Sequence, residues 1–170
     1  MIAAIPRVLG LALALAWALP AGAAFDSGPA QYRLLINGLS FHFATETPRS
    51  ELRETNPGLG LEGRWLGGVF AVAATYQDSY DGDSWLAGVG KRWAFWKSER
   101  GTLYVAGGGV IGVTYRRLEF GDPDRDLAGG VLPVLTLGAG AVEANLTVLP
   151  KLPGMIDDPA VALNFSLPLN

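Results

Sequence analysis

From residue 32 onward, apolar and polar or small residues alternate with a period of two in short segments. Clusters of Gly, Pro, Asp and Asn, which favour turns, separate these segments. None of the segments has the 3.6-residue period of a helix, and eight can be distinguished: 32–44, 56–65, 69–77, 84–94, 102–115, 132–138, 142–149 and 159–167. The pattern predicts an all-β protein.

The connections between these segments alternate in length. Those after the odd-numbered segments are long and polar, whereas those after the second and sixth are very short (LGG and AGA), and FWKSERG after the fourth is also short. In a meander, the odd-numbered connections all lie at one end. Long loops at one end and short turns at the other are typical of outer-membrane barrels. We therefore predict an eight-stranded antiparallel up-and-down transmembrane β-barrel over residues 25–170, with a soluble lipocalin-like barrel as the alternative.

The two faces of the predicted strands differ in side-chain size. In TLYVAGGGVIGVTY (102–115), one parity carries larger apolar groups and the other carries small ones. We expect the larger groups to face lipid and the small ones to line the interior. An eight-stranded barrel has room for only one slender ligand, so the small, mostly apolar lining favours a hollow shaped for an acyl chain.

The first two dozen residues have the three parts of a secretory signal. Arg7 supplies the positive charge, residues 8–19 form the apolar stretch, and residues 21–23 (AGA) are small enough for cleavage. The apolar stretch is shorter than the roughly 20 residues of a membrane-spanning helix. We predict that residues 1–24 are removed and that the protein leaves the cytoplasm of a double-membraned bacterium.

Composition excludes several classes of site. The 170 residues carry a net charge of −3, so no basic excess indicates nucleic acid, and the absence of cysteine excludes disulfides and thiolate metal sites. GGGVIG (107–112) matches a dinucleotide motif, but it lies inside a β segment rather than before a helix. Asp122, Asp124 and Asp126 have the spacing of a calcium loop, but the glycine that such a loop needs is missing, and Pro133 stands where its glutamate belongs. We interpret them as an exposed acidic loop and expect no metal and no cofactor.

The single histidine, His42, ends the first segment, and Asp78-Ser79 ends the third. The far ends of odd-numbered strands share one rim, so these residues can meet across the mouth of a small barrel. Adjacent strand residues point to opposite faces. Asp78 and Ser79 can therefore both face the interior only where the strand has broken, which the turn-like sequence TYQDSYDGDSW (75–85) permits.

Several short motifs, in order, resemble one family. They are SFHFA, QDSY, SWLAGVGKRW, GVTYR and LPVLTLGAGAVEANLTVLP, and they extend from about Leu39 to the last strand. The set is similar to the outer-membrane lipid A palmitoyltransferase (PagP) family. The resemblance implies that three residues at the outer surface are essential: His42, Asp78 and Ser79.

The same resemblance implies roles for five further residues. Gly90 matches the glycine that forms the floor of the acyl pocket, with Gly88 on the same wall, and Arg116 matches an arginine near the outer rim. Pro133 and Pro150 match prolines that flank a lateral opening for lipid. Proline suits such a place because it has no N–H to donate to a neighbouring strand.

The chain departs from the family at both ends. Residues 25–31 (FDSGPAQ) are too short for the amphipathic helix that precedes the first strand in the family. The last segment ends in NFSLPLN, with Pro168 and Asn170 where outer-membrane barrels usually have a terminal aromatic residue.

The function that we predict is transfer of a palmitoyl-like chain from a phospholipid donor to lipid A, by a monomer in the bacterial outer membrane that binds no nucleic acid. His42 would act as general base, since imidazole titrates near neutral pH, and Asp78 would orient it or stabilise its charged form. Ser79 is either a nucleophile or a donor to the developing oxyanion. The alternatives are a lipid deacylase or phospholipase that uses the same residues, and a non-enzymatic lipid-binding barrel.

Overall fold

A computed structural model describes residues 31–43, 47–117, 124–150 and 158–169. The predicted signal segment, residues 1–24, lies outside the described residues, as do Asp122 and most of the segment before the first strand. The two helices in the described part of the chain are single 3₁₀ turns, η1 (Arg49–Glu51) and η2 (Leu66–Gly68). None is long and apolar enough to cross a membrane.

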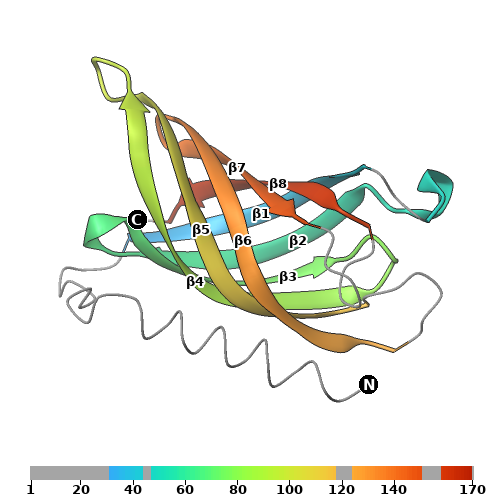
Figure 1. The fold of residues 1–170 in the computed structure, drawn as a ribbon. Helices are drawn as coiled ribbons and strands as arrows, with labels where there is room; N and C mark the ends of the chain where they lie inside the picture. The colour runs from blue at the N-terminus through green and yellow to red at the C-terminus, as the bar shows by residue number, and fades with distance from the viewer. Residues whose placement is uncertain (1–30, 44–46, 118–123, 151–157, 170) are drawn as a thin grey trace.

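Eight antiparallel strands form a closed barrel in which each strand pairs with its neighbours in sequence and β8 closes on β1 (Figure 1). The fold-class prediction is therefore confirmed. The strands are β1 (Gln31–His42), β2 (Thr55–Arg64), β3 (Val69–Gln77), β4 (Asp83–Lys97), β5 (Leu103–Arg116), β6 (Asp126–Ala139), β7 (Val142–Leu149) and β8 (Ala160–Pro168). We call the end where β1 finishes the mouth side, and the end with the short β2–β3, β4–β5 and β6–β7 connections the turn side.

Strand β6 begins at Asp126, six residues before the position that the sequence pattern predicted. The segment LAGG (127–130) falls in the long connection that the sequence pattern predicts after the fifth segment. It is a strand because each of its residues pairs with β5, in a register that runs from Arg116↔Asp126 to Leu103↔Ala139. Strand β4 is also longer than predicted and ends at Lys97, so the β4–β5 hairpin projects beyond the rest of the turn side (Figure 1).

Large apolar side chains face outward from seven of the eight strands, β3 being the exception among the described residues. Leu59, Leu61 and Leu127 each keep more than half of their surface exposed, at 58%, 54% and 57%. Aromatic residues occur near both ends of this outer face. Towards the mouth side they are Phe41, Trp85 and Tyr115, and towards the turn side Tyr32, Trp93, Phe95 and Trp96. Trp85 and Tyr115 stack with ring centroids 6.1 Å apart.

A bulge in β1 determines which of its residues face inward. Asn37 pairs with Asn164 of β8, and Leu39 pairs with Leu163, so Gly38 is an extra residue in the ladder. Because side chains alternate along a strand, one extra residue reverses the alternation. Residues 33, 35 and 37 face inward before the bulge, and residues 40 and 42 face inward after it, whereas Leu39 and Phe41 are about half exposed on the outside, at 52% and 53%.

The interior holds two cavities that meet at Phe70 and Arg92. The mouth-side cavity has a volume of about 210 Å³ and the turn-side cavity about 190 Å³. The Arg92 guanidinium lies over the Phe70 ring, 4.1 Å from its centroid. Both residues line both cavities, so together they form a partition across the barrel.

Candidate functional site

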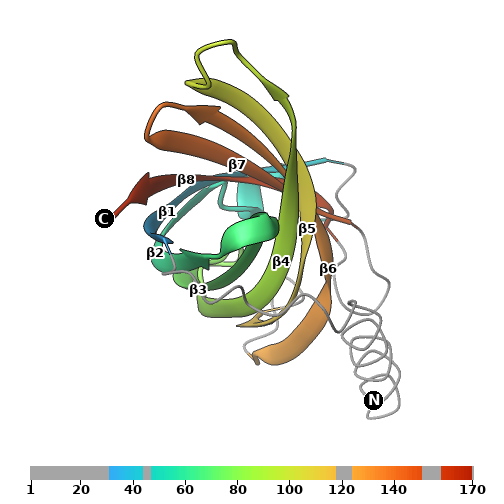
Figure 2. The same cartoon turned by 90° about the vertical axis from the view of Figure 1, so that its left-hand side faces the viewer.

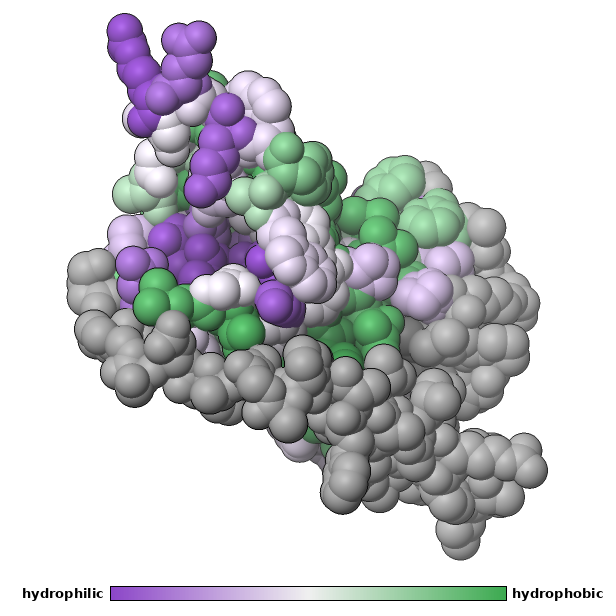
Figure 3. Space-filling view, turned by 60° about the vertical axis from the view of Figure 1, so that its left-hand side comes forward, coloured by the Kyte–Doolittle hydropathy of each residue, from purple (hydrophilic) through white to green (hydrophobic). Residues whose placement is uncertain are grey.

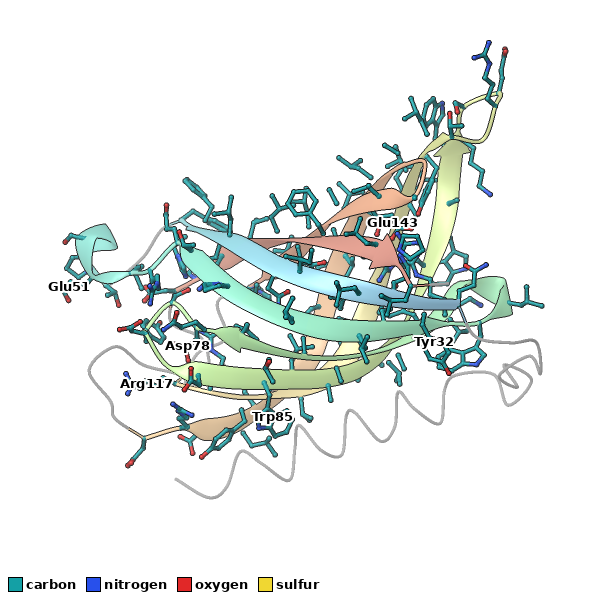
Figure 4. All side chains as sticks on the ribbon, turned by 180° about the vertical axis from the view of Figure 1, so that it is seen from behind. Tyr32, Glu51, Asp78, Trp85, Arg117 and Glu143 are labelled. Atoms are coloured by element: carbon teal, nitrogen blue, oxygen red, sulfur yellow. The ribbon has the colours of Figure 1, made fainter. Side chains whose placement is uncertain are left out.

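The mouth-side cavity brings together the three residues that the sequence singled out. His42, Asp78 and Ser79 all line it, and their exposed fractions are 3%, 1% and 6%. They come from the end of β1 and from the residues directly after β3. Figure 4 shows Asp78 at this end of the barrel, with Arg117 beside it and Tyr32 at the opposite end. Small and apolar side chains of the surrounding strands form most of the remaining wall, among them Val72, Ala74, Leu86, Val110 and Ala162.

Asp78 organises the turn that follows β3. Its Oδ1 accepts hydrogen bonds from the backbone N–H groups of Tyr80 (3.0 Å) and Gly82 (2.8 Å). Its Oδ2 accepts from the Ser84 hydroxyl (2.7 Å) and from the Arg117 N–H (3.3 Å). Four donors therefore converge on one buried carboxylate. The strand breaks at Gln77, and this break lets Asp78 and Ser79 line the same cavity.

The Ser79 hydroxyl lies beside two polar side chains that the sequence analysis did not identify. Ser40 Oγ is 3.4 Å from Ser79 Oγ, and Asn56 Nδ2 donates to the same oxygen at 3.4 Å. Asn56 also donates to the Gln77 carbonyl (3.1 Å), so it holds the end of β3 as well. Asn56 is 8% exposed, and its Oδ1 makes no hydrogen bond to another described residue. The polar residue before Pro57, at the start of a segment that continues as Gly-Leu-Gly-Leu, was the available signal.

His42 faces the cavity because of the bulge at Gly38. Its strand partner is Ala160 of β8, and its inward neighbours on β1 are Ser40 and, across the bulge, Asn37. A glycine inside a strand pattern is a known sign of a bulge. The direction in which His42 points could thus have been argued from the sequence.

Contacts among the mouth-side loops close one side of the site. Tyr80 is buried and donates from its hydroxyl to Asp158 Oδ2 (3.0 Å). Asp158 Oδ1 accepts from the Thr47 N–H (3.3 Å), so three loops meet at one buried carboxylate. Arg117 donates to the Tyr80 carbonyl (2.9 Å). These contacts join residues far apart in the chain, and no local pattern marks them.

The residues that the family resemblance assigned to substrate lie at different depths. Arg116 lines the mouth-side cavity, and its guanidinium carbon is 5.8 Å from the Tyr80 ring centroid. Gly88 lines the same cavity. Gly90 lies behind Phe70: a Cβ at position 90 would be 2.4 Å from the Phe70 ring and 2.4 Å from the Gly109 carbonyl oxygen. Phe70, rather than Gly90, is the surface that faces the cavity.

Pro133 and Pro150 border a part of the wall where strand pairing stops. Residues 134–139 of β6 pair with 142–147 of β7. Residues 126–133 pair with β5 on one side, and the described part of the chain supplies no strand on their other side. In Figure 2 this first half of β6 runs apart from β7. Pro133 directly precedes the paired stretch and Pro150 directly follows β7. Gly130 and Leu132 line the cavity, so the unpaired edge borders it.

The turn-side half of the interior is charged. Glu62 is 1% exposed and Glu143 is 3% exposed. Arg64 forms ion pairs with both, and Arg92 with Glu62. Glu143 also accepts from the Ser166 hydroxyl (2.8 Å). Figure 3 brings this end forward and shows hydrophilic groups gathered in its middle, beside hydrophobic ones. We call Arg33, Glu62, Arg64, Arg92 and Glu143 the turn-side charge cluster.

Fold and site together define a closed eight-stranded up-and-down barrel with a buried polar cluster at the mouth of an internal cavity. No family model and no curated protein matches the chain. Among solved structures it is similar to the outer membrane protein Ail of Yersinia pestis, determined in a phospholipid bilayer nanodisc. The two share 12% identity over 81% of this chain and 99% of Ail, with a TM-score of 0.36. The likeness concerns the fold alone.

Proposed function

We propose that the protein is an outer-membrane acyltransferase that moves a fatty acyl chain from a phospholipid to lipid A. One observation carries the proposal: a mostly apolar cavity inside the barrel has His42 and Ser79 buried at its mouth and an unpaired strand edge in its wall. An acyl chain can lie in such a cavity with its ester group at the polar mouth. The palmitoyl chain is the one that the family resemblance implies.

The outer surface supports a place in a membrane. Apart from the unpaired edge of β6, the closed barrel satisfies the backbone hydrogen bonds of its strands internally, which a strand protein in lipid requires. The outward side chains are large and apolar, with aromatic residues near both ends, and this arrangement is typical of outer-membrane barrels. A soluble lipocalin-like barrel would instead present polar groups to water on this face.

The proposed reaction exchanges one ester bond for another. The acceptor hydroxyl of lipid A attacks the ester carbonyl carbon of the phospholipid while His42 takes its proton. The old C–O bond then breaks, and the leaving lysophospholipid oxygen receives that proton from His42. Because one ester bond forms as one breaks, the step needs no cofactor.

We assign Ser79 to the oxyanion rather than to the attack. Asn56 donates to Ser79 Oγ, which leaves the Ser79 proton to be directed towards a developing negative oxygen. Asp78 is then a positioning residue, because its carboxylate accepts from the turn that places Ser79. Trapping experiments should find no acyl group on Ser79 after mixing with donor. A covalent acyl-Ser79 would make it the nucleophile instead.

Activity should be measured with purified protein in detergent, using phosphatidylcholines labelled in chains of ten to sixteen carbons, with and without lipid A. We expect label on lipid A, and we expect His42→Ala to slow this transfer by about 10²–10⁴-fold, the usual contribution of a general base. Arg53→Ala, on the exposed rim, is the matched control. Release of free fatty acid alone would identify a hydrolase, and no His42-dependent turnover of any chain would identify a non-enzymatic barrel.

A further inference from the structure

Deep in the mouth-side cavity, near Phe70 and Arg92, the wall carries a row of three asparagines. Asn37 of β1 pairs with Asn164 of β8, which pairs in turn with Asn145 of β7. All three line the cavity. Above them the lining is mostly small and apolar, so this row marks a sharp change in the polarity of the wall.

Two members of the row are held by hydrogen bonds. Asn145 Nδ2 donates to Asn164 Oδ1 at 3.1 Å. Asn145 Oδ1 accepts from the Thr136 hydroxyl (2.7 Å) and from Arg92 Nη1 (3.3 Å). These bonds connect the row to the turn-side charge cluster and fix its height in the barrel.

Asn37 stands at the other end of the row and differs from its neighbours. Its Nδ2 is buried and makes no hydrogen bond to another described residue. A buried amide of this kind is costly unless an acceptor meets it. A plain hydrocarbon tail that reached Asn37 would displace water and offer nothing in return. An oxygen on the tail would supply the acceptor.

The depth of the row sets the position of that oxygen. His42 pairs with Ala160 and Asn37 pairs with Asn164, so the row lies four residues along β8 from the level of His42. A rise of about 3.3 Å per residue and a tilt of about 40° place it roughly 10 Å deeper along the barrel axis. An extended chain advances about 1.25 Å per C–C bond, so a chain of about ten carbons brings its far end to the row.

We propose that the acyl chain taken by this cavity is about ten carbons long and carries an oxygen at or near its far end, where the Asn37 carboxamide binds it. This inference rests on the proposed acyltransferase function and names the class of acyl group that it transfers. Such a site should be specific for the oxygenated chain, because a pocket with a buried hydrogen-bonding group discriminates against an analogue that lacks the matching polar atom.

The test compares three phosphatidylcholine donors in the lipid A assay: decanoyl, 10-hydroxydecanoyl and 3-hydroxydecanoyl. The last carries the same hydroxyl at the wrong depth. We expect kcat/KM for the 10-hydroxydecanoyl donor to exceed the other two by about tenfold or more, as one buried hydrogen bond provides. In Asn37→Leu, which keeps the size of the side chain, this ratio should fall to one or below.

Asn164→Leu is the matched variant in the same row. It removes the acceptor of Asn145 and should slow all three donors together without changing their ratio. Equal rates for decanoyl and 10-hydroxydecanoyl in the wild-type protein would overturn the inference, as would an unchanged preference in Asn37→Leu or an equal gain from the 3-hydroxyl. Transfer of palmitoyl without any such preference overturns only this inference. Transfer of no chain overturns the proposed function as well.

Discussion

The two cavities of the barrel are similar in volume but differ in the side chains around them. About 210 Å³ on the mouth side is bounded mostly by small and apolar groups, whereas the 190 Å³ on the turn side is bordered by Arg64, Arg92 and Tyr104. Strands β2 to β6 line both, with the same alternation of inward side chains. The strand backbones therefore determine only the volume and shape of each cavity. The size and charge of the inward side chains determine whether they form ion pairs with one another, as on the turn side, or leave room for a ligand, as on the mouth side.

Removing one partner of the turn-side charge cluster should have the largest effect on stability. Glu143→Leu leaves Arg64 buried without one of its two carboxylates, and a broken buried pair costs about 3–5 kcal/mol of unfolding free energy. Urea unfolding in lipid vesicles, followed by tryptophan fluorescence, measures this loss. The mouth-side reaction should persist below the lowered unfolding midpoint. A loss of under about 1 kcal/mol, the value of an exposed pair, would remove the contrast between the two cavities.

Asp78→Ala should give the next largest effect, and it should be confined to the mouth side. Four hydrogen bonds to one carboxylate are lost. Their donors lie in loops that can relax and bind water, so the net loss is about 1.5–3 kcal/mol, the value of one bond to a charged group. We expect acyl transfer to fall about 100-fold, since a displaced catalytic group commonly costs that much. Hydrogen exchange at residues 79–82 should accelerate while β4 and β5 remain protected. Unchanged exchange in this turn would show that the carboxylate does not hold it.

At the partition, Gly90→Ala tests whether Phe70 separates the two cavities. The added methyl group would lie 2.4 Å from both the Phe70 ring and the Gly109 oxygen, and overpacking of this kind costs about 1–3 kcal/mol. We expect a lower melting temperature and a preference for shorter acyl chains, because Phe70 must move towards the mouth. Gly130→Ala is the matched control: nothing lies within 4 Å of its Cβ position. Equal effects of the two substitutions would contradict this account.

Asn56→Leu should lower kcat about fivefold with little change in KM. The substitution removes the hydrogen bond to Ser79 Oγ, worth about 1 kcal/mol, but leaves the apolar walls that bind the chain. Steady-state kinetics with varied donor separates the two constants. If KM rises instead while kcat stays constant, Asn56 serves donor binding rather than the placement of Ser79.

Arg53→Ala should have the smallest effect, although it also breaks an ion pair. Arg53 pairs with Asp81 on the rim, and their side chains are 43% and 71% exposed. Exposed pairs contribute about 0–1 kcal/mol because water and salt screen them. Compared with Glu143→Leu in the same unfolding experiment, this variant isolates burial as the variable. Comparable losses in the two variants would mean that burial is not what makes the inner cluster matter.

The period-two pattern predicted the number, order and class of the strands, because side chains in a barrel wall must alternate along every strand. It failed at the start of β6, where the glycines of LAGG (127–130) favour a turn. Considered alone, a glycine-rich stretch favours a turn. Here it belongs to a strand that makes fourteen residue pairs with β5. Pairing between distant residues is not visible in a local window.

The part of the site that lies at strand ends could be predicted from the sequence. The contacts between side chains of different strands could not. Counting strands placed His42 and Asp78-Ser79 on one rim. It did not reveal Asn56 beside Ser79, nor that Phe70 covers Gly90, because these contacts follow from barrel register and side-chain direction. The polar interior of the turn side was likewise not predicted. The expected lining was inferred from residues 102–115, and this strand, β5, is the one richest in glycine.

Gly38 divides β1 into two halves whose inward-facing residues differ in parity. Before it, odd-numbered residues face inward, and after it, even-numbered ones do. If Gly38 instead took a regular place in the ladder, the second half of β1 would change faces and His42 and Phe41 would exchange environments. The imidazole would move to the outer surface and a benzyl group to the centre of the polar cluster. The chemistry of the mouth thus depends on a residue that contributes no side chain to it.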